Sequence, residues 1–351
     1  MRKAASRFGV PVAVGLALGA VVGPARAQDQ TTLALPSITP GFTAIYVADE
    51  RGYWRDQDLT VKVTQIAGVG TINAVIAGSI DFSGSTAGTL IRAAVAGQRM
   101  MAIANLTDRP MDEIVLRKDV AARLKFDPNA TLEKRAALLS GLTIAVDAIN
   151  TVNHGFLRYV AKRGGIDADR QVTVAPMQSP TLAAALTAHA IDGFSVSLPW
   201  TTSVIVDGSA VAIASVPNGD FPELVPFGGG LIVTRPDFCR ENRSICVKMG
   251  RGIVAAIRFI REHPDETLAL LKPHFPQLGE AALAAAFNSY RAATPSPPAP
   301  TEAVLANSQE FEVNGGVTKP ENKLASFDGL YTDEFVQPED EPETVKLRDT
   351  P

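Results

Sequence analysis

Short apolar runs alternate with longer amphipathic segments along most of the chain, and this alternation predicts strands and helices in turn. The first strand is expected at residues 32–35 and the next at 60–65, where Val61 and Val63 alternate with polar residues. Helical spacing follows in Ala-rich segments such as 87–96, which stops at a glycine. Strands that alternate with helices of this length indicate parallel sheets covered by helices.

The same order of elements recurs in a second copy later in the chain. Its strands are expected at 143–146, 172–175 and 194–197, and its helices at 154–162 and 180–188. Each copy contains a Tyr-Val-Ala helix followed by a glycine, and each has an Ala-rich helix that ends at Ile-Asp. Two similar α/β units predict two lobes, and a groove between lobes is a favoured position for a small-molecule site.

Two apolar strands that end in Arg and then Asp flank the second copy, at residues 114–119 and 231–237. We interpret them as crossover strands between the lobes. Lobe 1 then comprises residues 28–112 and 231–337, and lobe 2 comprises 113–230. The alternative of two consecutive domains leaves the C-terminal helices without a sheet to cover.

The two ends of the chain differ in composition from the rest. Residues 1–27 have the form of a signal peptide, because a basic start precedes an apolar run at 8–22 and an Ala-Arg-Ala cleavage pattern at 25–27. The apolar run is shorter than the roughly 20 residues of a membrane-spanning helix. Residues 338–351 are rich in Pro and charge, so we expect this tail to be disordered.

The charge of the chain narrows the choice of partners. The formal net charge of −4 becomes −8 when the basic leader is removed, because the leader holds four basic residues and no acid. A net-acidic chain without basic blocks argues against nucleic acid as a partner. The four histidines are scattered, and their spacing predicts neither a metal site nor a cofactor.

The chain has two cysteines, Cys239 and Cys246. Seven residues of a straight helix span about 10 Å, which is too far for a disulfide. A bridge therefore needs a break between them, and residues 240–244 supply one if Ser244 caps a second helix. For an oxidising compartment we favour the disulfide over two buried free thiols.

Several weak motifs occur in an order that matches one known family. The similarity lies in residues 33–35, in the helix at 46–48 with the glycine that follows it, in the run 74–82 and in the block 141–200. Together they resemble periplasmic solute-binding proteins of ABC importers, in the NMT1/THI5-like and sulfonate-, nitrate- and taurine-binding group. The resemblance covers nearly the whole chain after the leader.

This resemblance implies a two-lobed periplasmic binding protein of type II. In that α/β fold each lobe is a helix-flanked, mostly parallel sheet, and two crossover strands join the lobes. The resemblance also implies a periplasmic protein that closes on a small polar or anionic solute, such as a sulfonate, nitrate, taurine or a pyrimidine. Such a protein docks on a membrane permease with its ATPase, and we expect it to be a monomer.

Catalysis is not implied. The Cys-rich iron motif of the family's fungal-type pyrimidine synthase branch is missing from the sequence, as are Gly-x-Ser-x-Gly, Gly-x-x-x-x-Gly-Lys-Ser/Thr and His-Glu-x-x-His. Asp81 and Asp192 recur like a carboxylate pair, but their shared position after an Ala-rich helix favours a structural role. The alternatives are a pyrimidine- or small-acid-processing enzyme on this scaffold and a ligand-sensing module for a membrane receptor.

Five turns rich in Ser, Thr and Gly mark the expected binding site. Ligands of such sheets lie beyond the carboxyl ends of strands and against helix N-termini, where free N–H groups favour an anion. Helix capping explains each turn by itself, so only convergence of several turns on one cleft makes a site. The turn residues that we expect to contact the ligand are Ser37, Thr39, Gly70, Thr71, Ser85, Thr86, Asn150 and Thr151.

Larger side chains complete the expected site. Phe42, Trp200 and Phe227 are candidates for apolar walls, with core packing as the alternative for Phe42. His154 lies near a helix start and is a candidate hydrogen-bonding residue, with a surface position as the alternative. Arg109 suits bidentate binding of an anion, against the alternative of a solvated loop residue. The three glycines after Phe227 suit either a hinge or backbone contact with the ligand.

Overall fold

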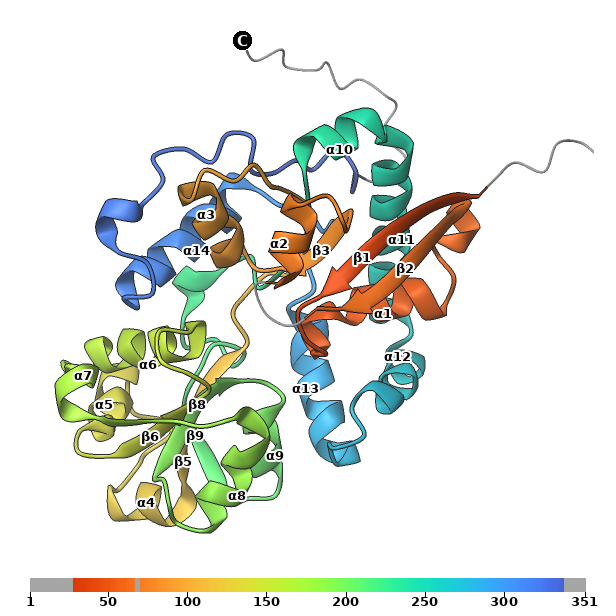
Figure 1. Ribbon diagram of the computed structural model, residues 1–351. Coiled ribbons are helices and arrows are strands. Elements are labelled where there is room, and N and C mark those ends of the chain that lie inside the picture. The colour runs from red at the N-terminus through yellow and green to blue at the C-terminus, as the bar shows by residue number, and fades with distance from the viewer. Residues whose placement is uncertain (1–27, 67–69, 338–351) are drawn as a thin grey trace, which may run out of the picture.

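The computed structural model describes residues 28–66 and 70–337, which form two lobes (Figure 1). The expected signal peptide at 1–27, the expected tail at 338–351 and part of one expected turn, at 67–69, lie outside the described residues. None of the helices in the described ranges combines the length and the apolar character that crossing a bilayer requires.

The first lobe is built on a five-stranded sheet with the strand order β2-β1-β3-β10-β4. β1 (Asp29–Leu35) pairs in parallel with β2 (Leu59–Gln65) and with β3 (Phe82–Ser85). β10 (Gly230–Thr234) lies between β3 and β4 (Met101–Thr107) and runs antiparallel to both. All strands of this sheet except β10 therefore share one direction.

The second lobe repeats this scheme with the strand order β7-β6-β8-β5-β9. β6 (Thr143–Val146) pairs in parallel with β7 (Thr173–Pro176) and with β8 (Gly193–Ser197). β5 (Asp112–Arg117) is the antiparallel strand, between β8 and β9 (Ala210–Ser215). The predicted fold of two mostly parallel sheets, joined by two crossovers, is confirmed.

Helices cover both faces of each sheet (Figure 1). The helices of lobe 1 and of the C-terminal region are α1 (Thr43–Glu50), α2 (Gly70–Ile76), α3 (Ala87–Val95), α10 (Pro236–Glu241), α11 (Arg243–Glu262), α12 (Pro264–Leu271), α13 (Glu280–Ala292) and α14 (Glu302–Asn314). The helices of lobe 2 are α4 (Lys118–Arg123), α5 (Leu132–Ala136), α6 (Val152–Arg163), α7 (Ala168–Gln171), α8 (Leu182–Thr187) and α9 (Trp200–Val206).

Strand residues alternate between two separate cores in each lobe. In β10, Ile232 packs into one apolar cluster and its neighbour Val233 into another. In β5, Ile114 and Val115 divide in the same way. Because successive side chains of a strand point to opposite faces, this division shows that both faces are buried, as the near-continuous apolar strands of the sequence require.

Two segments connect the lobes and lie side by side. Residues 108–111 link β4 to β5, and residues 216–229 link β9 to β10. Gly229 N donates a hydrogen bond to Thr107 O at 3.0 Å, which ties the second link to the end of β4. Both expected crossover strands are present, as β5 and β10, but each ends before its expected boundary, because α4 and α10 begin there.

The three glycines of the second link serve close packing, not unusual backbone angles. None of Gly228, Gly229 and Gly230 has a left-handed φ. A Cβ atom at Gly228 would overlap Ala87, and one at Gly229 would overlap the carbonyl oxygen of Arg109. The glycines therefore let the second link approach α3 and the first link closely.

The last two helices touch both lobes. α14 packs against α3 in lobe 1 and against α6 in lobe 2, and α13 packs against α9 of lobe 2. Tyr290 on α13 donates its hydroxyl hydrogen to Leu198 O of lobe 2 at 3.2 Å. The lobe boundaries at 28–112 with 231–337 and at 113–230 stay a prediction, and the C-terminal helices lie across the lobe junction.

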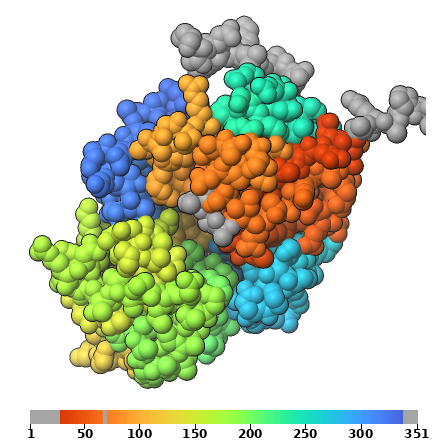
Figure 2. Space-filling view, in the orientation of Figure 1, coloured from red at the N-terminus to blue at the C-terminus, as the bar shows by residue number. Residues whose placement is uncertain are grey.

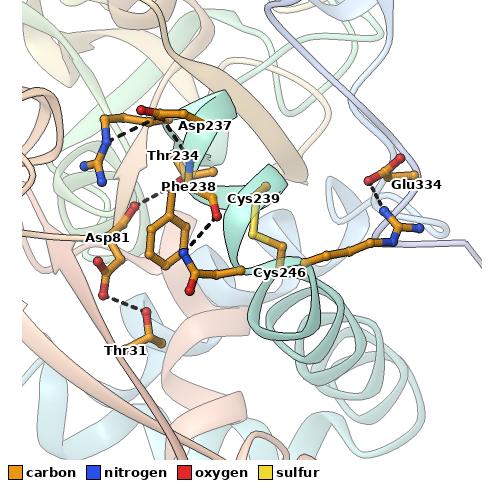
Figure 3. Close-up of a disulfide and its surroundings, with 11 residues drawn as sticks. Thr31, Asp81, Thr234, Asp237, Phe238, Cys239, Cys246 and Glu334 are labelled. Carbon is orange, nitrogen blue, oxygen red and sulfur yellow. Dashed lines mark hydrogen bonds and ion pairs between the residues drawn. A yellow bond between two sulfur atoms is a disulfide. The ribbon is translucent and has the colours of Figure 1, made fainter. Parts of the chain in front are cut away.

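The recurrent aspartates have the structural role that the sequence favoured. Asp81 Oδ2 accepts hydrogen bonds from Thr32 N at 2.9 Å and from Thr31 Oγ1 at 2.8 Å, and Asp192 Oδ2 accepts one from Thr143 N at 2.9 Å. Each carboxylate thus ties the end of a helical segment to a strand of its own sheet, β1 for Asp81 and β6 for Asp192. Figure 3 shows the bonds of Asp81 to Thr31 and Thr234.

Cys239 and Cys246 form the disulfide that the sequence favoured (Figure 3). The break that it needs lies at Asn242, between α10 and α11, where the backbone leaves the helical region. The predicted cap is wrong, because Ser244 lies inside the first turn of α11 and Asn242 precedes that helix without a side-chain capping bond. A one-residue kink is therefore enough to bring the two cysteines together.

Candidate ligand-binding site

A cavity of about 520 Å³ lies where the two lobes, the two links and the C-terminal helices meet. Figure 2 shows the lobes meeting along one seam. Lobe 1 contributes Pro36, Ser37, Thr39, Gly41, Phe42, Thr86, Gly88, Arg92 and Thr107. The links contribute Arg109, Pro110, Met111, Phe227 and Gly229, and lobe 2 contributes Asp112, Asp147, Asn150, Thr151, Val152, Asn153 and Ser197. The C-terminal helices and the turn that follows contribute Tyr290, Phe311, Glu312 and Val317.

Most of the expected ligand-contacting residues lie on this cavity wall. They come from the ends of β1 and β3 in lobe 1, from the turn after β6 in lobe 2 and from the second link. These wall residues are Ser37, Thr39, Phe42, Thr86, Asn150, Thr151 and Phe227. The convergence of several turns on one cleft, on which the sequence argument depends, is therefore present, and Arg109 joins them.

Five expected residues do not reach the wall. Gly70 and Thr71 lie in the first turn of α2, and Thr71 is buried there. Ser85 is the buried last residue of β3, and the chain turns so that Thr86, the next residue, faces the cavity instead. Trp200 begins α9 and packs against the core behind the second sheet.

His154 is the fifth residue that does not reach the wall. Its two predecessors on α6, Val152 and Asn153, do line the cavity. The ring of His154 instead faces back over the preceding loop. His154 Nδ1 accepts a hydrogen bond from Asn150 N at 3.0 Å. Burial, followed by the nearby Arg158, lowers the pKa of His154, which favours the neutral ring that this bond requires. His154 therefore holds the turn that carries Asn150.

The capping alternative also holds for the threonines of the site. Thr86 Oγ1 accepts from Thr89 N at 3.3 Å, Thr151 Oγ1 accepts from His154 N at 3.4 Å, and Thr39 Oγ1 accepts from Gly41 N at 3.4 Å. A hydroxyl that caps a helix has a fixed position. Capping a helix and lining the cavity are therefore compatible for these threonines, because the capping bond holds each side chain at the cavity wall.

Tyr46 fixes the loop after β1. Its hydroxyl accepts a hydrogen bond from Thr39 N at 3.1 Å and donates one to Thr39 O at 3.2 Å. Burial raises the pKa of Tyr46 to about 12, so the hydroxyl keeps the proton that it donates. The ring of His274 stacks on the ring of Tyr46, with the two centroids 4.5 Å apart.

A partly buried ion pair joins α3 to α14. Arg92 Nη1 pairs with Glu312 Oε1, and Thr318 Oγ1 donates to Glu312 Oε2 at 2.7 Å. The Glu312 side chain is only 3% exposed. Its carboxylate lies so close to Gly88 that a Cβ atom at that position would overlap it. The carboxylate thus lies beside the first turn of α3, where a helix attracts negative charge.

Asp112 is a buried carboxyl on the opposite side of the cavity. It begins β5, is 2% exposed and accepts a hydrogen bond from Ser197 Oγ at 3.0 Å. Burial raises the pKa of Asp112 to about 7, and the charges of Asp147 and Glu113 act in the same direction. Among the described wall residues, Asp112 is therefore the group whose pKa is raised to the neutral range.

Asp147 lies beside Asp112 in the turn after β6. Its Oδ1 accepts hydrogen bonds from Thr151 Oγ1 at 2.6 Å and from Ala148 N at 2.8 Å. Thr151 is the N-cap of α6, so this carboxylate supplies the start of that helix with negative charge.

Arg109, on the first link, is held by the carboxylate of Asp108, with Nε 2.7 Å from Oδ1.

The residues that sequence reasoning missed reach the site through tertiary structure. Glu312 and Tyr290 come from helices at the far end of the chain, and no local pattern marks them. Asp112 had a usable signal, because it lies two residues before an expected crossover strand. Among the described residues there is no group of His, Cys, Asp or Glu that is arranged to hold a metal ion.

The two helix-covered sheets and the two links between them form the two-lobed fold of periplasmic binding proteins. Residues 26–271 match the model of the NMT1-like family, so the chain belongs to that family. No curated protein matches the chain.

Solved structures of similar fold include two sulfonate-binding proteins. The periplasmic aliphatic sulphonate binding protein SsuA from Escherichia coli is 15% identical, with a TM-score of 0.64, and the match covers 81% of this chain and 85% of that one. The alkanesulfonate-binding protein SsuA from Xanthomonas axonopodis pv. citri, bound to MOPS, is 18% identical, with a TM-score of 0.61 and coverage of 84% and 96%.

A nitrate-binding protein has the same fold. The periplasmic nitrate-binding protein NrtA from Synechocystis PCC 6803 is 18% identical, with a TM-score of 0.54, and the match covers 69% of this chain and 65% of that one. At these identities the similarity shows the fold and not the ligand.

Proposed function

We propose that this protein is the periplasmic solute-binding component of an ABC importer and that it captures a small polar or anionic solute by closure of its lobes. The observation that supports this most directly is the cavity, because its wall combines both lobes, both links and the C-terminal helices. Contacts from all of these parts exist together only in the closed form, so a solute that makes them shifts the open–closed equilibrium.

The ligand classes come from the relatives. The similar structures are named as binders of sulfonates and nitrate, and taurine and pyrimidines complete the range that the family resemblance implies. Binding without turnover is part of the proposal, because the family resemblance does not imply catalysis. The closed form is proposed to dock on a permease with its ATPase.

The test is a thermal-shift screen of the mature protein against sulfonates, nitrate, taurine, pyrimidines and small carboxylates, followed by calorimetry on each hit. We expect at least one compound to raise the melting temperature and to reduce the radius of gyration in small-angle X-ray scattering. Silence across a broad metabolite library with folded protein contradicts the proposal, and turnover of a bound compound replaces it with an enzyme.

Export and partnership need separate tests. N-terminal sequencing of protein from the periplasmic fraction is expected to begin at Gln28, directly after the Ala-Arg-Ala pattern. Uptake of the identified solute by cells is expected to require both this protein and a permease, and the purified protein is expected to elute as a monomer. Unchanged uptake after loss of the protein argues for the ligand-sensing alternative.

A further inference from the structure

We propose that the solute carries an N–H-bearing cationic group, an ammonium or an amidinium, that binds Asp112 with Asp147 beside it. This inference rests on the proposed function, because it names the chemical class that the same cavity takes. It departs from the anionic ligands of the similar structures, and four observations on the cavity wall support it.

The first observation is that the chain's own carboxylates lie beside the helix starts that would receive an anion. Glu312 lies against Gly88 in the first turn of α3, and Asp147 accepts a hydrogen bond from the N-cap of α6. A helix N-terminus attracts one negative group through its free N–H groups and its dipole. An anionic solute at either helix therefore meets a carboxylate that is already there.

The second observation is that the arginines of the wall are already paired. Arg92 forms its ion pair with Glu312, and Arg109 forms one with Asp108 through Nε and Nη2. A solute anion would have to compete with an intramolecular carboxylate for each guanidinium group. Arg109, the cationic residue that the sequence suggested for binding an anion, is thus largely neutralised by Asp108.

The third observation is that two carboxyl groups of the wall lack a basic partner. In the part of the chain that the structure describes, neither Asp112 nor Asp147 forms an ion pair with Lys, Arg or His. Asp112 receives one hydrogen bond, from Ser197, although it is almost fully buried. Buried charges are normally paired, so a cation from outside the chain would stabilise the ionised form of this carboxyl.

The groups around Asp112 do not provide that cation. Glu113 adjoins it on β5, Asp147 faces it from the turn after β6, Ser197 from β8 and Tyr290 from α13. The two carboxylates raise the pKa of Asp112 further, and burial raises the pKa of Tyr290 so that it stays neutral. A bound ammonium or amidinium would reverse this, because it favours the ionised carboxylate.

The fourth observation is the apolar body of the cavity. Phe42, Phe227, Tyr290 and Phe311 line it and are mostly buried. Aromatic side chains bind the apolar part of a solute and also attract a cation through their ring faces. The cavity therefore suits a compact organic cation with an apolar body better than a small inorganic anion.

The test compares ligands that differ only in their head group. Calorimetric titrations of the mature protein at pH 7.5 use benzamidine and benzylamine as cations and benzenesulfonate and benzoate as anions. We expect saturable binding of at least one cation and none of the anions. In the Asp112→Asn variant we expect the affinity for the cation to fall roughly 10- to 100-fold, the range for a lost charged hydrogen bond.

Matched controls keep the result interpretable. Asp119→Asn removes an exposed carboxylate that pairs with Arg117 outside the cavity, and this variant is expected to bind like the wild type. If Asp112→Asn does not fold, Asp147→Asn and a pH series on the wild type replace it. We expect the cation's affinity to fall as the pH drops below about 7, because protonation removes the charge of Asp112.

Three outcomes overturn the inference. They are an anion that binds as tightly as the cations, no detectable binding of either cation, and an affinity for the cation that is the same in Asp112→Asn as in the wild type. An anion that binds and closes the lobes leaves the proposed solute-binding function in place. Silence of all four probes together with a silent metabolite library overturns both proposals.

Discussion

The buried carboxyl of Asp112 makes a quantitative prediction about stability in the absence of ligand. The group is 2% exposed, and its pKa rises from 3.8 to about 7, chiefly through burial. Each pH unit between the folded and unfolded pKa values corresponds to about 1.4 kcal/mol. Ionisation of Asp112 therefore costs the native state about 4 kcal/mol.

The sign follows from proton counting. Between about pH 4 and pH 7 the folded protein keeps a proton on Asp112 that the unfolded chain has lost. The free energy of unfolding therefore decreases as the pH rises through this window. The protonated Asp112 favours the folded state fully only below about pH 4. Above about pH 8 both states are ionised and the slope vanishes.

The assay is urea denaturation of the wild type and of Asp112→Asn at steps from pH 4 to pH 8. The asparagine still accepts the hydrogen bond from Ser197 but carries no charge. We expect the wild type to lose stability relative to the variant as the pH rises, by about 4 kcal/mol in total. A difference that stays constant across the window refutes the reasoning.

An exposed aspartate provides the control for this assay. Asp119 is exposed, and its hydrogen bond from Arg117 lowers its pKa. A group of that kind stabilises the fold above its unfolded pKa and loses this effect as the pH falls. Relative to the Asp119→Asn variant, the wild type should therefore lose no stability as the pH rises from 4 to 7.

Three further predictions concern the site and its support. Gly88→Ala places a methyl group against the Glu312 carboxylate and should cost about 1–3 kcal/mol in thermal denaturation, whereas Gly279→Ala, where the added Cβ meets no atom within 4 Å, should be near neutral. Cys239→Ala with Cys246→Ala should cost about 2–3 kcal/mol by loss of the short loop constraint, and a reductant should destabilise the wild type but not the double variant. Tyr290→Phe removes the hydrogen bond to Leu198 O, worth about 1 kcal/mol, and should expand the ligand-free protein in small-angle scattering; an unchanged scattering curve contradicts this role.

Local patterns were sufficient for the scaffold. The apolar strands and the Ala-rich helices predicted both sheets, because alternation of this kind follows from burial of both sheet faces. Capping signals placed Thr39, Thr86 and Thr151 at helix starts. Since a helix start in such a sheet faces the cleft, these signals also located a large part of the cavity wall.

Two kinds of residue were beyond local patterns. On α6, Val152 and Asn153 reach the cavity while His154 turns away, because a rotation of about 100° per residue separates neighbours on a helix. Sequence gives the helix but not this angle. Glu312 reaches Arg92 across 220 residues of chain, and no periodicity encodes such a contact.

The two lobes share a scaffold, but the charges at their helix starts do not follow from it. Asp81 and Asp192 do the same work in the two sheets, as expected for features that the fold itself requires. Glu312 and Asp147, in contrast, are held in unrelated ways, one by Arg92 on α3 and the other by a threonine hydroxyl. A fold that places helix starts at a cleft favours anions only while those starts are free. In this chain carboxylates lie beside them, so the similarity to sulfonate- and nitrate-binding structures shows the shared fold, and the charge of the proposed ligand depends on Asp112.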